Sequence, residues 1–268
     1  MTATALLRER AVELARLHRE GPPLVLPNAW DVASARLVEA AGFPAVATSS
    51  SAVAASLGYP DGEVIPVDEM FAAVARIARA VDVPVTADLE AGYGLQAREL
   101  VERLLAAGAV GMNIEDSRRP REGDEASEPM LPVAEAAARL AGIREAAEAA
   151  GVPVVLNARI DLFLRRGGAQ VGLVDDALMR AREYVAAGAD SIFPIFIGEE
   201  EAIARIVAGA GAPLNVLLRA GVPPLDRLTA LGVRRISFGG GLLRVANATL
   251  GGVLGELATG NAAAFQRR

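Results

Sequence analysis

The sequence predicts an α/β fold, a (β/α)8 TIM-type barrel that uses residues 1–268 as a single domain. Three observations lead to this prediction. Apolar runs alternate with Ala-, Arg- and Glu-rich stretches of helical spacing, eight such runs are present, and several helical stretches end in Ala-Gly. A repeated βα unit with short connections builds a parallel sheet, and eight units at this length close into a barrel. An open doubly wound sheet is the alternative, but no Gly-x-Gly-x-x-Gly follows the first run.

The elements can be placed in order along the chain. Residues 1–20 carry charges throughout and predict an N-terminal amphipathic helix, not a signal peptide. Strands are expected at 24–27, 45–48, 83–88, 111–115, 152–159, 191–196, 213–218 and 235–238. Helices are expected at 33–41, 67–81, 97–107, 133–150, 174–187, 199–209 and 224–231, and the mildly amphipathic residues 247–268 are compatible with a further helix. The glycines at 42, 108, 151 and 188 are expected to end their helices in the left-handed conformation.

The composition excludes several classes of protein. With 268 residues and 52% hydrophobic content the chain can build a large core, yet no apolar run reaches the roughly 18 residues that span a bilayer. Cysteine is absent, which excludes disulfides, thiolate metal sites and cysteine nucleophiles, and a cytoplasmic location is the default expectation. The net charge of −6 argues against nucleic acid as a partner. The only histidine, His18, is expected to be an ordinary surface residue of the first helix without a catalytic role.

Acidic side chains follow the third and fourth predicted strands, at the point where each strand ends. Asp88 and Glu90 are two residues apart and share one face, as do Asn113 and Glu115. Converging carboxylates are costly to bury unless a cation neutralises them. Hard oxygen ligands suit Mg²⁺, with Mn²⁺ also possible, better than zinc. The sequence therefore predicts a metal site, and the alternative is that some of these carboxylates cap helices or pair with arginines.

Other polar residues also lie at the expected carboxyl ends of strands, where active sites of such barrels form. Arg159 ends an apolar strand and is suited to bind a carboxylate or phosphate through two N–H groups. Its alternative role is a structural ion pair with Asp161. Ser49, Ser50 and Ser51 follow the second strand and offer donors for a carboxylate or an oxyanion, with helix capping as the alternative.

Two turn-like segments complete the candidate set. Asp61 lies in the segment Gly-Tyr-Pro-Asp-Gly-Glu at 58–63, whose composition is typical of turns. Three consecutive glycines at 239–241 follow the last predicted strand. They are similar to the phosphate-binding turns of many barrels, although a tight packing turn explains them equally well.

Together these motifs resemble the isocitrate lyase/phosphoenolpyruvate mutase superfamily. The resemblance runs from Leu-Pro-Asn-Ala-Trp-Asp at 26–31 to about Asn215. The matching motifs are Ala-Gly-Phe at 41–43 leading to Thr-Ser-Ser-Ser at 48–51, Ser-Leu-Gly-Tyr-Pro-Asp at 56–61, Ala-Asp-Leu-Glu-Ala-Gly-Tyr-Gly at 87–94, Asn-Ile-Glu-Asp at 113–116 and Asn-Ala-Arg-Ile-Asp at 157–161. Their order, spacing and chemistry agree with those of the superfamily.

The resemblance implies an assembly, a cofactor and residue roles. Such enzymes form dimers or tetramers, commonly with the last helix swapped to a neighbouring subunit, so a homotetramer is expected. They use Mg²⁺ to hold a small 2-oxo or 2-hydroxy carboxylate and to stabilise an enolate at its 2-oxygen. By resemblance, Asp88 is the direct metal ligand, while Asp61, Glu90 and Glu115 hold the metal mainly through waters. The implied substrate-binding residues are Ser49, Ser50, Ser51, Asp88, Arg159 and Asn215, with Asn215 at the substrate's far end.

The chain departs from the lyases of this superfamily in the loop after the fourth strand. Residues 117–128 lack the Lys-Lys-Cys-Gly-His sequence whose cysteine is the catalytic acid/base, and they carry Arg118, Arg119 and Arg121 instead. These arginines either close over an anionic substrate or form a solvated charge run. Without the cysteine, a metal-activated water, Asp61, Tyr59 or a loop residue has to move the proton.

Two further departures concern the distal end of the pocket. A glutamate that follows Phe-Pro of the sixth strand in the lyases is Ile195 here, and a hydroxyl-bearing residue two positions past Asn215 is Leu217. The distal end is therefore expected to be less polar than in a tricarboxylate lyase.

We therefore predict a Mg²⁺-dependent enzyme that acts on small 2-oxo or 2-hydroxy carboxylates. The leading reaction is carbon–carbon bond cleavage, by a lyase or by an oxaloacetate-type hydrolase or decarboxylase. One alternative is a phosphoenolpyruvate or phosphonopyruvate mutase or hydrolase, and another is a metal-dependent binder of 2-oxo acids with little turnover. Neither nucleic acid nor a membrane is expected as a partner.

Overall fold

Parallel strands form a ring at the centre of the molecule in the computed structural model, which describes residues 2–118, 130–166 and 169–265. The strands are β1 (Leu24–Leu26), β2 (Asn28–Ala29), β3 (Val46–Thr48), β4 (Val85–Asp88), β5 (Gly111–Glu115), β6 (Val155–Ile160), β7 (Ser191–Pro194), β8 (Asn215–Leu217) and β9 (Arg235–Ser237). One sheet has the order β2-β3-β4-β5-β6-β7 and the other β1-β9-β8, with every ladder parallel.

Two junctions join these sheets into a closed barrel. β1 and β2 occupy one strand position and are separated only by Pro27, which has no N–H to donate. At the other junction, Ile192 of β7 forms a parallel bridge with Leu214, and its N–H donates to the carbonyl of Pro213 at 2.9 Å. Eight strand positions therefore follow one another around the ring, and the predicted TIM-type barrel is confirmed.

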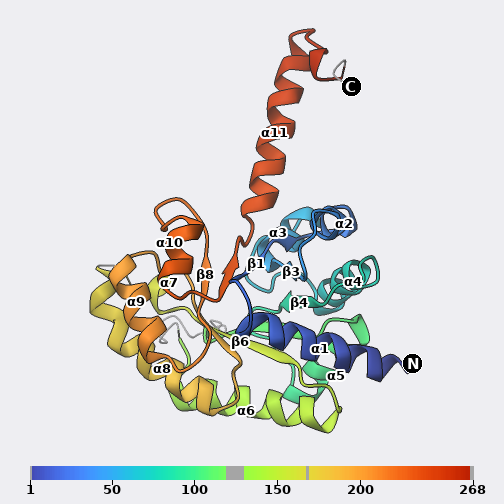
Figure 1. Cartoon of the computed structure of the whole chain (residues 1–268). Coiled ribbons are helices and arrows are strands. Elements are labelled where there is room, and N and C mark those ends of the chain that lie inside the picture. The colour runs from blue at the N-terminus through green and yellow to red at the C-terminus, as the bar shows by residue number, and fades with distance from the viewer. Residues whose placement is uncertain (1, 119–129, 167–168, 266–268) are drawn as a thin grey trace, which may run out of the picture.

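The helices surround this ring (Figure 1). They are α1 (Ala3–Arg19), α2 (Val32–Ala40), α3 (Ser50–Ser56), α4 (Val67–Ala78), α5 (Ala97–Ala107), α6 (Val133–Ala149), α7 (Leu162–Arg165), α8 (Val174–Ala186), α9 (Glu200–Gly209), α10 (Leu225–Ala230) and α11 (Gly241–Ala258), with short 3-10 turns η1 (Gln170–Leu173) and η2 (Ala263–Phe265). The predicted helices are present within a few residues of their expected ends. The sequence prediction missed α3, α7 and η1, and it placed the start of the last helix too late.

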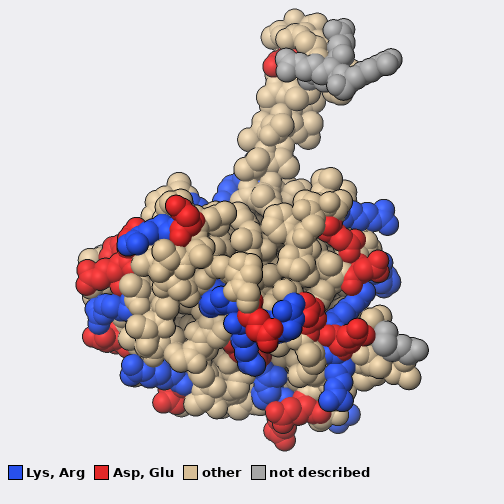
Figure 2. All heavy atoms as spheres, viewed as in Figure 1, with Lys and Arg blue, Asp and Glu red and all other residues tan. Residues whose placement is uncertain are grey.

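The last helix, α11, projects away from the barrel (Figure 1). None of its residues is buried, and Val245, Leu250 and Leu254 are more than half exposed. Figure 2 shows acidic and basic side chains mixed over the barrel body and hardly any along this helix. Within the part of the chain that the structure describes, no helix is both long and apolar enough to cross a membrane.

The first helix, α1, covers the amino-terminal ends of the strands. Leu14 and His18 face inward and are buried. A Cβ on Gly111, the first residue of β5, would lie 2.7 Å from Leu14 Cδ2 and 3.1 Å from Thr86 Cβ, so only glycine fits beneath the helix there. The expectation that His18 lies on the surface is wrong, since only 1% of it is exposed.

A chain of polar side chains runs through the barrel interior from His18 upward. Its Nδ1 lies 2.7 Å from the carbonyl of Leu14 and must donate to it, so Nε2 accepts from Arg235 Nη1 at 3.1 Å. Arg235 Nη2 donates to Asn113 Oδ1 at 3.1 Å, and Asn157 Nδ2 donates to the same oxygen at 2.8 Å. Burial, and next the charge of Arg235, lower the pKa of His18 to about 3, so its imidazole is neutral in the folded protein.

Candidate active site

A cavity of about 430 Å³ opens where the carboxyl ends of the strands meet. Six of the predicted site residues line it, namely Ser49, Ser50, Ser51, Asp61, Asp88 and Arg159. This end of the barrel gathers residues that are far apart in sequence because every parallel strand ends on the same side. The structure therefore brings these six predicted site residues together around one cavity.

Asp88, the last residue of β4, is held from one side only. The backbone N–H and the hydroxyl of Ser50 donate to Asp88 Oδ2 at 3.1 and 2.8 Å, and the Asp88 N–H donates to Thr48 Oγ1 at 3.0 Å. Its other oxygen, Oδ1, is buried and has no hydrogen-bond partner. A buried carboxylate oxygen without a partner is costly, so it is suited to receive a cation or a donor from a ligand.

The three serines form the start of α3, a helix that the sequence analysis did not predict. Ser49 is its N-cap, with the hydroxyl accepting from the Ala52 N–H at 3.4 Å, and Ser49 Oγ lies 3.1 Å from Ser51 Oγ. The capping alternative is therefore correct for Ser49. All three serines still line the cavity, so the first turn of α3 both contains the helix cap and faces the space where a ligand would bind.

Arg159 is clamped between two carboxylates. Its Nη1 lies 2.6 Å from Glu115 Oε2, while its Nε and Nη2 donate to Asp161 Oδ1 and Oδ2 at 2.6 and 3.1 Å. Burial disfavours the charged guanidinium, but Glu115 and Asp161 outweigh it and raise the pKa of Arg159. The ion pair with Asp161, an alternative from the sequence, is present, and it fixes the orientation of the guanidinium at the cavity wall.

The other two predicted metal carboxylates, Glu90 and Glu115, are buried and do not themselves line the cavity. Glu90 accepts from the Tyr93 hydroxyl at 2.9 Å and from the Glu63 N–H at 2.7 Å. Burial, followed by the negative charge of Asp88, raises the pKa of Glu90 to about 7. Burial also raises the pKa of Glu115, although Arg159 opposes this. Across the described ranges, no three His, Cys, Asp or Glu side chains form a group that could hold a metal ion directly.

Two predicted residues lie outside the cavity lining. The Tyr59 hydroxyl donates to Glu69 Oε1 at 2.8 Å in an exposed contact on α4. Asn215 is fully buried beneath the cavity, where its Nδ2 donates to Ser237 Oγ at 3.3 Å. The structure therefore does not bring Tyr59 or Asn215 to the same space as the serines and Asp88.

The cavity also contains residues that the sequence prediction missed. Arg219 and Arg244 line its far wall, together with Phe193, Phe196 and Leu217. The two arginines lie beyond strand ends in Gly- and Leu-rich segments and belong to none of the motifs that carried the resemblance. The available signal was an arginine directly after apolar residues, Leu217 and Leu218 before Arg219, and Leu242 and Leu243 before Arg244.

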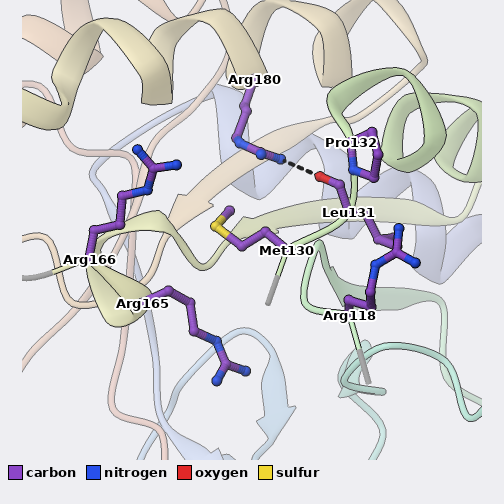
Figure 3. Close-up of a pocket in the computed structure, with 7 residues that line it drawn as sticks. All are labelled: Arg118, Met130, Leu131, Pro132, Arg165, Arg166 and Arg180. Carbon is purple, nitrogen blue, oxygen red and sulfur yellow. Dashed lines mark hydrogen bonds between the residues drawn. The ribbon is translucent and has the colours of Figure 1, made fainter. Parts of the chain in front are cut away.

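A second hollow of about 750 Å³ shares no lining residue with this cavity and is rich in arginine (Figure 3). Arg118, Arg165, Arg166 and Arg180 line it, and Arg180 Nη1 donates to the carbonyl of Leu131 at 3.0 Å. The predicted gating arginines at positions 119 and 121 lie outside the described residues, as do the other residues of 119–129 and 167–168.

The family profile described as Phosphoenolpyruvate phosphomutase matches residues 14–258, which is nearly the whole chain. The chain belongs to this family. The resemblance seen in the motifs is thereby confirmed, and members of the phosphoenolpyruvate mutase/isocitrate lyase superfamily are enzymes.

Three relatives of this family member have comparable length. A solved structure from Burkholderia cenocepacia J2315, provisionally called a phosphonomutase, superposes with a TM-score of 0.85 at 39% identity, covering 93% of this chain and 99% of that one. An uncharacterized protein of Mycobacterium tuberculosis H37Rv is 34% identical over 83% of this chain and 80% of its own length. An oxaloacetate decarboxylase of Bradyrhizobium is 31% identical over 84% of this chain and 76% of its own.

Proposed function

We propose that the protein is a Mg²⁺-dependent enzyme that cleaves a carbon–carbon bond in a small 2-oxo or 2-hydroxy carboxylate, as a lyase or as an oxaloacetate-type hydrolase or decarboxylase. The observation that carries this proposal is the cavity in which Asp88 Oδ1 has no partner beside three serines and a fixed arginine. The name of the Bradyrhizobium relative supports an oxaloacetate-like substrate.

The residues present fit a magnesium ion with one direct protein ligand. Mg²⁺ keeps several waters and is often bound through only one or two carboxylates. Asp88 would hold it directly through Oδ1, and Asp61, Glu90 and Glu115 would hold its waters. When bound, the ion supplies Lewis-acid stabilisation of the negative charge that develops on the substrate's 2-oxygen. Mn²⁺ has similar ligand preferences and could replace it.

The protein's own side chains orient the substrate. The hydroxyl groups of Ser49 and Ser51 would donate to its carboxylate and 2-oxygen from one wall. Ser50, whose N–H and hydroxyl are bound to Asp88 Oδ2, positions that carboxylate instead. Arg159 binds the carboxylate from the neighbouring wall, and its two acidic partners keep the guanidinium from turning away. Asp61, which lines the same cavity, is the side chain we assign to proton transfer. Tyr59 is less suited to this role because its hydroxyl is bound to Glu69.

A second candidate function is a phosphoenolpyruvate or phosphonopyruvate mutase or hydrolase. The family profile and the 39% identity with the Burkholderia protein favour it. A phosphonate and a carboxylate both require cationic groups in the same cavity, so product identity has to separate the two candidates.

We also propose a cytoplasmic homo-oligomer, a dimer or a tetramer, in which α11 packs on another subunit. The helix has no buried residue in one chain and exposes Val245, Leu250 and Leu254. An apolar groove of about 330 Å³ that includes Trp30 and Leu37 lies beside the base of α11 and could receive such a helix. The absence of cysteine accords with a reducing compartment.

The experiment that tests the enzymatic proposal combines binding with product analysis. The purified protein is melted with Mg²⁺ and each of pyruvate, oxaloacetate, 2-oxoglutarate, isocitrate, methylisocitrate, phosphoenolpyruvate and phosphonopyruvate, and hits are followed by NMR. We expect stabilisation that requires Mg²⁺, with oxaloacetate converted either to pyruvate and carbon dioxide or, with water, to oxalate and acetate. Conversion of phosphonopyruvate instead would select the second candidate.

Two variants make this experiment specific. Asp88→Asn keeps the size of the side chain but removes its charge, and it should abolish metal-dependent stabilisation and turnover. Asp226→Asn, on the exposed surface of α10, is the matched control and should behave like the parent protein. If no compound stabilises the protein with or without Mg²⁺, the proposed function is wrong, and stabilisation without product would indicate a binder.

A further inference from the structure

The hollow in Figure 3 has an excess of positive charge, and we call it the arginine hollow. Figure 3 shows its four arginines, Arg118, Arg165, Arg166 and Arg180, arranged around Met130. None of the described residues that line it is acidic, and the others besides Met130 are Leu131 and Pro132. Apolar surroundings strengthen the attraction of such cations for an anion, because they lower the local dielectric constant.

Carboxylates near the arginine hollow neutralise this charge only in part. Within the described ranges, Arg165 forms no ion pair. Arg118 Nη2 lies 3.4 Å from Glu135 and Arg166 Nη1 lies 3.8 Å from Asp176, and both carboxylates are more than half exposed. The buried Nε of Arg118 has no hydrogen-bond partner. Exposed ion pairs at these distances contribute little, so a bound anion can replace them.

Arg180 is the one arginine of the hollow that a buried carboxylate holds in place. Its Nη1 lies 3.0 Å from Asp116 Oδ2, an oxygen that also accepts from the Tyr184 hydroxyl at 2.7 Å. All of its hydrogen bonds to described residues use this same Nη1. Its Nε and Nη2 groups therefore remain as donors for a ligand, on a guanidinium that the protein has already oriented.

A chain of hydrogen bonds leads from the arginine hollow to the proposed active site. Arg165 Nη2 donates to Ser117 Oγ at 3.0 Å, and the Ser117 hydroxyl donates to Asp161 Oδ2. Asp161 is the carboxylate that orients Arg159 at the cavity wall. Ser117 and Asp161 are buried, so water screens the charges along this chain only weakly. A change of charge beside Arg165 therefore reaches Arg159.

We propose that the arginine hollow is a second anion-binding site, for a phosphate group or a polycarboxylate, and that its occupant regulates the active site. Arginine suits either anion because its planar N–H groups match both. A volume of about 750 Å³ accommodates a metabolite-sized ligand. The negative charge of the occupant opposes binding of the substrate carboxylate at Arg159, so each ligand weakens the binding of the other.

Calorimetric titration of the Mg²⁺-loaded protein with inorganic phosphate and, separately, with propane-1,2,3-tricarboxylate tests for the site. We expect Arg165→Gln and Arg166→Gln each to weaken binding of at least one of these anions about tenfold or more, since each change removes a cationic donor. Both arginines are exposed, so both variants should fold. The anion that shows the larger loss identifies the class of ligand.

Two control variants separate this site from other sources of anion binding. Arg244→Gln removes an exposed arginine of the active-site cavity, and Arg227→Gln removes an exposed arginine that pairs with Glu200 on the outer helices. Both should leave the affinity for phosphate and tricarboxylate unchanged. The site is refuted if neither anion binds the parent protein, if the two hollow variants bind like the parent, or if Arg244→Gln weakens binding as much as Arg165→Gln does.

The link to the active site is tested by titrating pyruvate, which the proposed cleavage does not consume, with and without a saturating amount of the bound anion. This measurement alone rests on the proposed function. We expect the anion to weaken pyruvate binding severalfold, and Ser117→Ala to reduce this effect while the anion still binds. An unchanged pyruvate affinity would refute the link. Absence of binding by every 2-oxo acid would contradict the proposed function and leave the anion site standing.

Discussion

Acidification should destabilise the folded protein through its single histidine, His18. The imidazole is 1% exposed, donates to the carbonyl of Leu14 and accepts from Arg235. Its pKa falls from the ordinary 6.5 to about 3 on folding. Below pH 6.5 the His18 side chain is therefore protonated in the unfolded chain but stays neutral in the native state. The stability that the neutral imidazole contributes is present above pH 6.5 and is lost as the pH falls toward 3.

The magnitude follows from this difference in pKa. One unit of pKa shift corresponds to about 1.4 kcal/mol, so the loss approaches that value per pH unit once the unfolded histidine is fully protonated. Integrated from pH 7 to pH 5, His18 alone lowers the free energy of unfolding by about 2 kcal/mol. His18→Gln can keep both hydrogen bonds but cannot be protonated in this pH range, so its free energy of unfolding should lack this pH-dependent loss.

Two measurements check the reasoning. Urea unfolding of the parent protein and of His18→Gln at pH 7 and pH 5 should differ in their pH dependence by about 2 kcal/mol, because all carboxylates are common to both proteins. In the folded protein, the NMR signal of the only imidazole should not move between these pH values. A titration midpoint near 6.5 in the folded protein would refute the buried, neutral assignment.

Three further outcomes are expected. Gly111→Ala should lower the free energy of unfolding by about 1–3 kcal/mol because its Cβ would lie 3.1 Å from Thr86 Cβ, whereas Gly252→Ala on α11 has open space and should be neutral or stabilising in urea unfolding. Arg159→Gln should cost about 3–5 kcal/mol, since it leaves two buried carboxylates unpaired, and an unfolding midpoint equal to that of the parent would contradict the clamp. Leu254→Asp should shift the protein toward monomers in light scattering, and an unchanged mass would argue against packing through α11.

The barrel and one side of its site could be predicted because both follow from local sequence. Strand ends in a parallel barrel share one side, so acidic residues such as Asp88 directly after apolar runs had to meet there. β5 has the predicted bounds, 111–115, because the acidic residues Glu115 and Asp116 directly follow its apolar residues. The conformation of Ser49 was less accessible, since a serine after a strand can cap a helix or bind a ligand, and here it caps α3.

Other features depend on contacts that no local pattern records. The helical spacing of α1 gives no sign that His18 meets Arg235, more than two hundred residues later in the chain. Arg219 and Arg244 line the cavity because the ring of strands closes and brings the residues after β8 and the start of α11 to its mouth. The sequence also could not predict that α11 projects away from the barrel, because the spacing of apolar residues in a helix does not specify the surface against which they pack.

In the proposed oligomer, the position of α11 would link turnover to protein concentration. Its first turn borders the cavity and carries Arg244, while the rest of the helix has no buried residue within one chain. In the proposed oligomer, the neighbouring subunit that supports the helix therefore also steadies one wall of the active site. Dilution that separates the subunits should lower the rate per subunit, and concentrating the same sample should restore it.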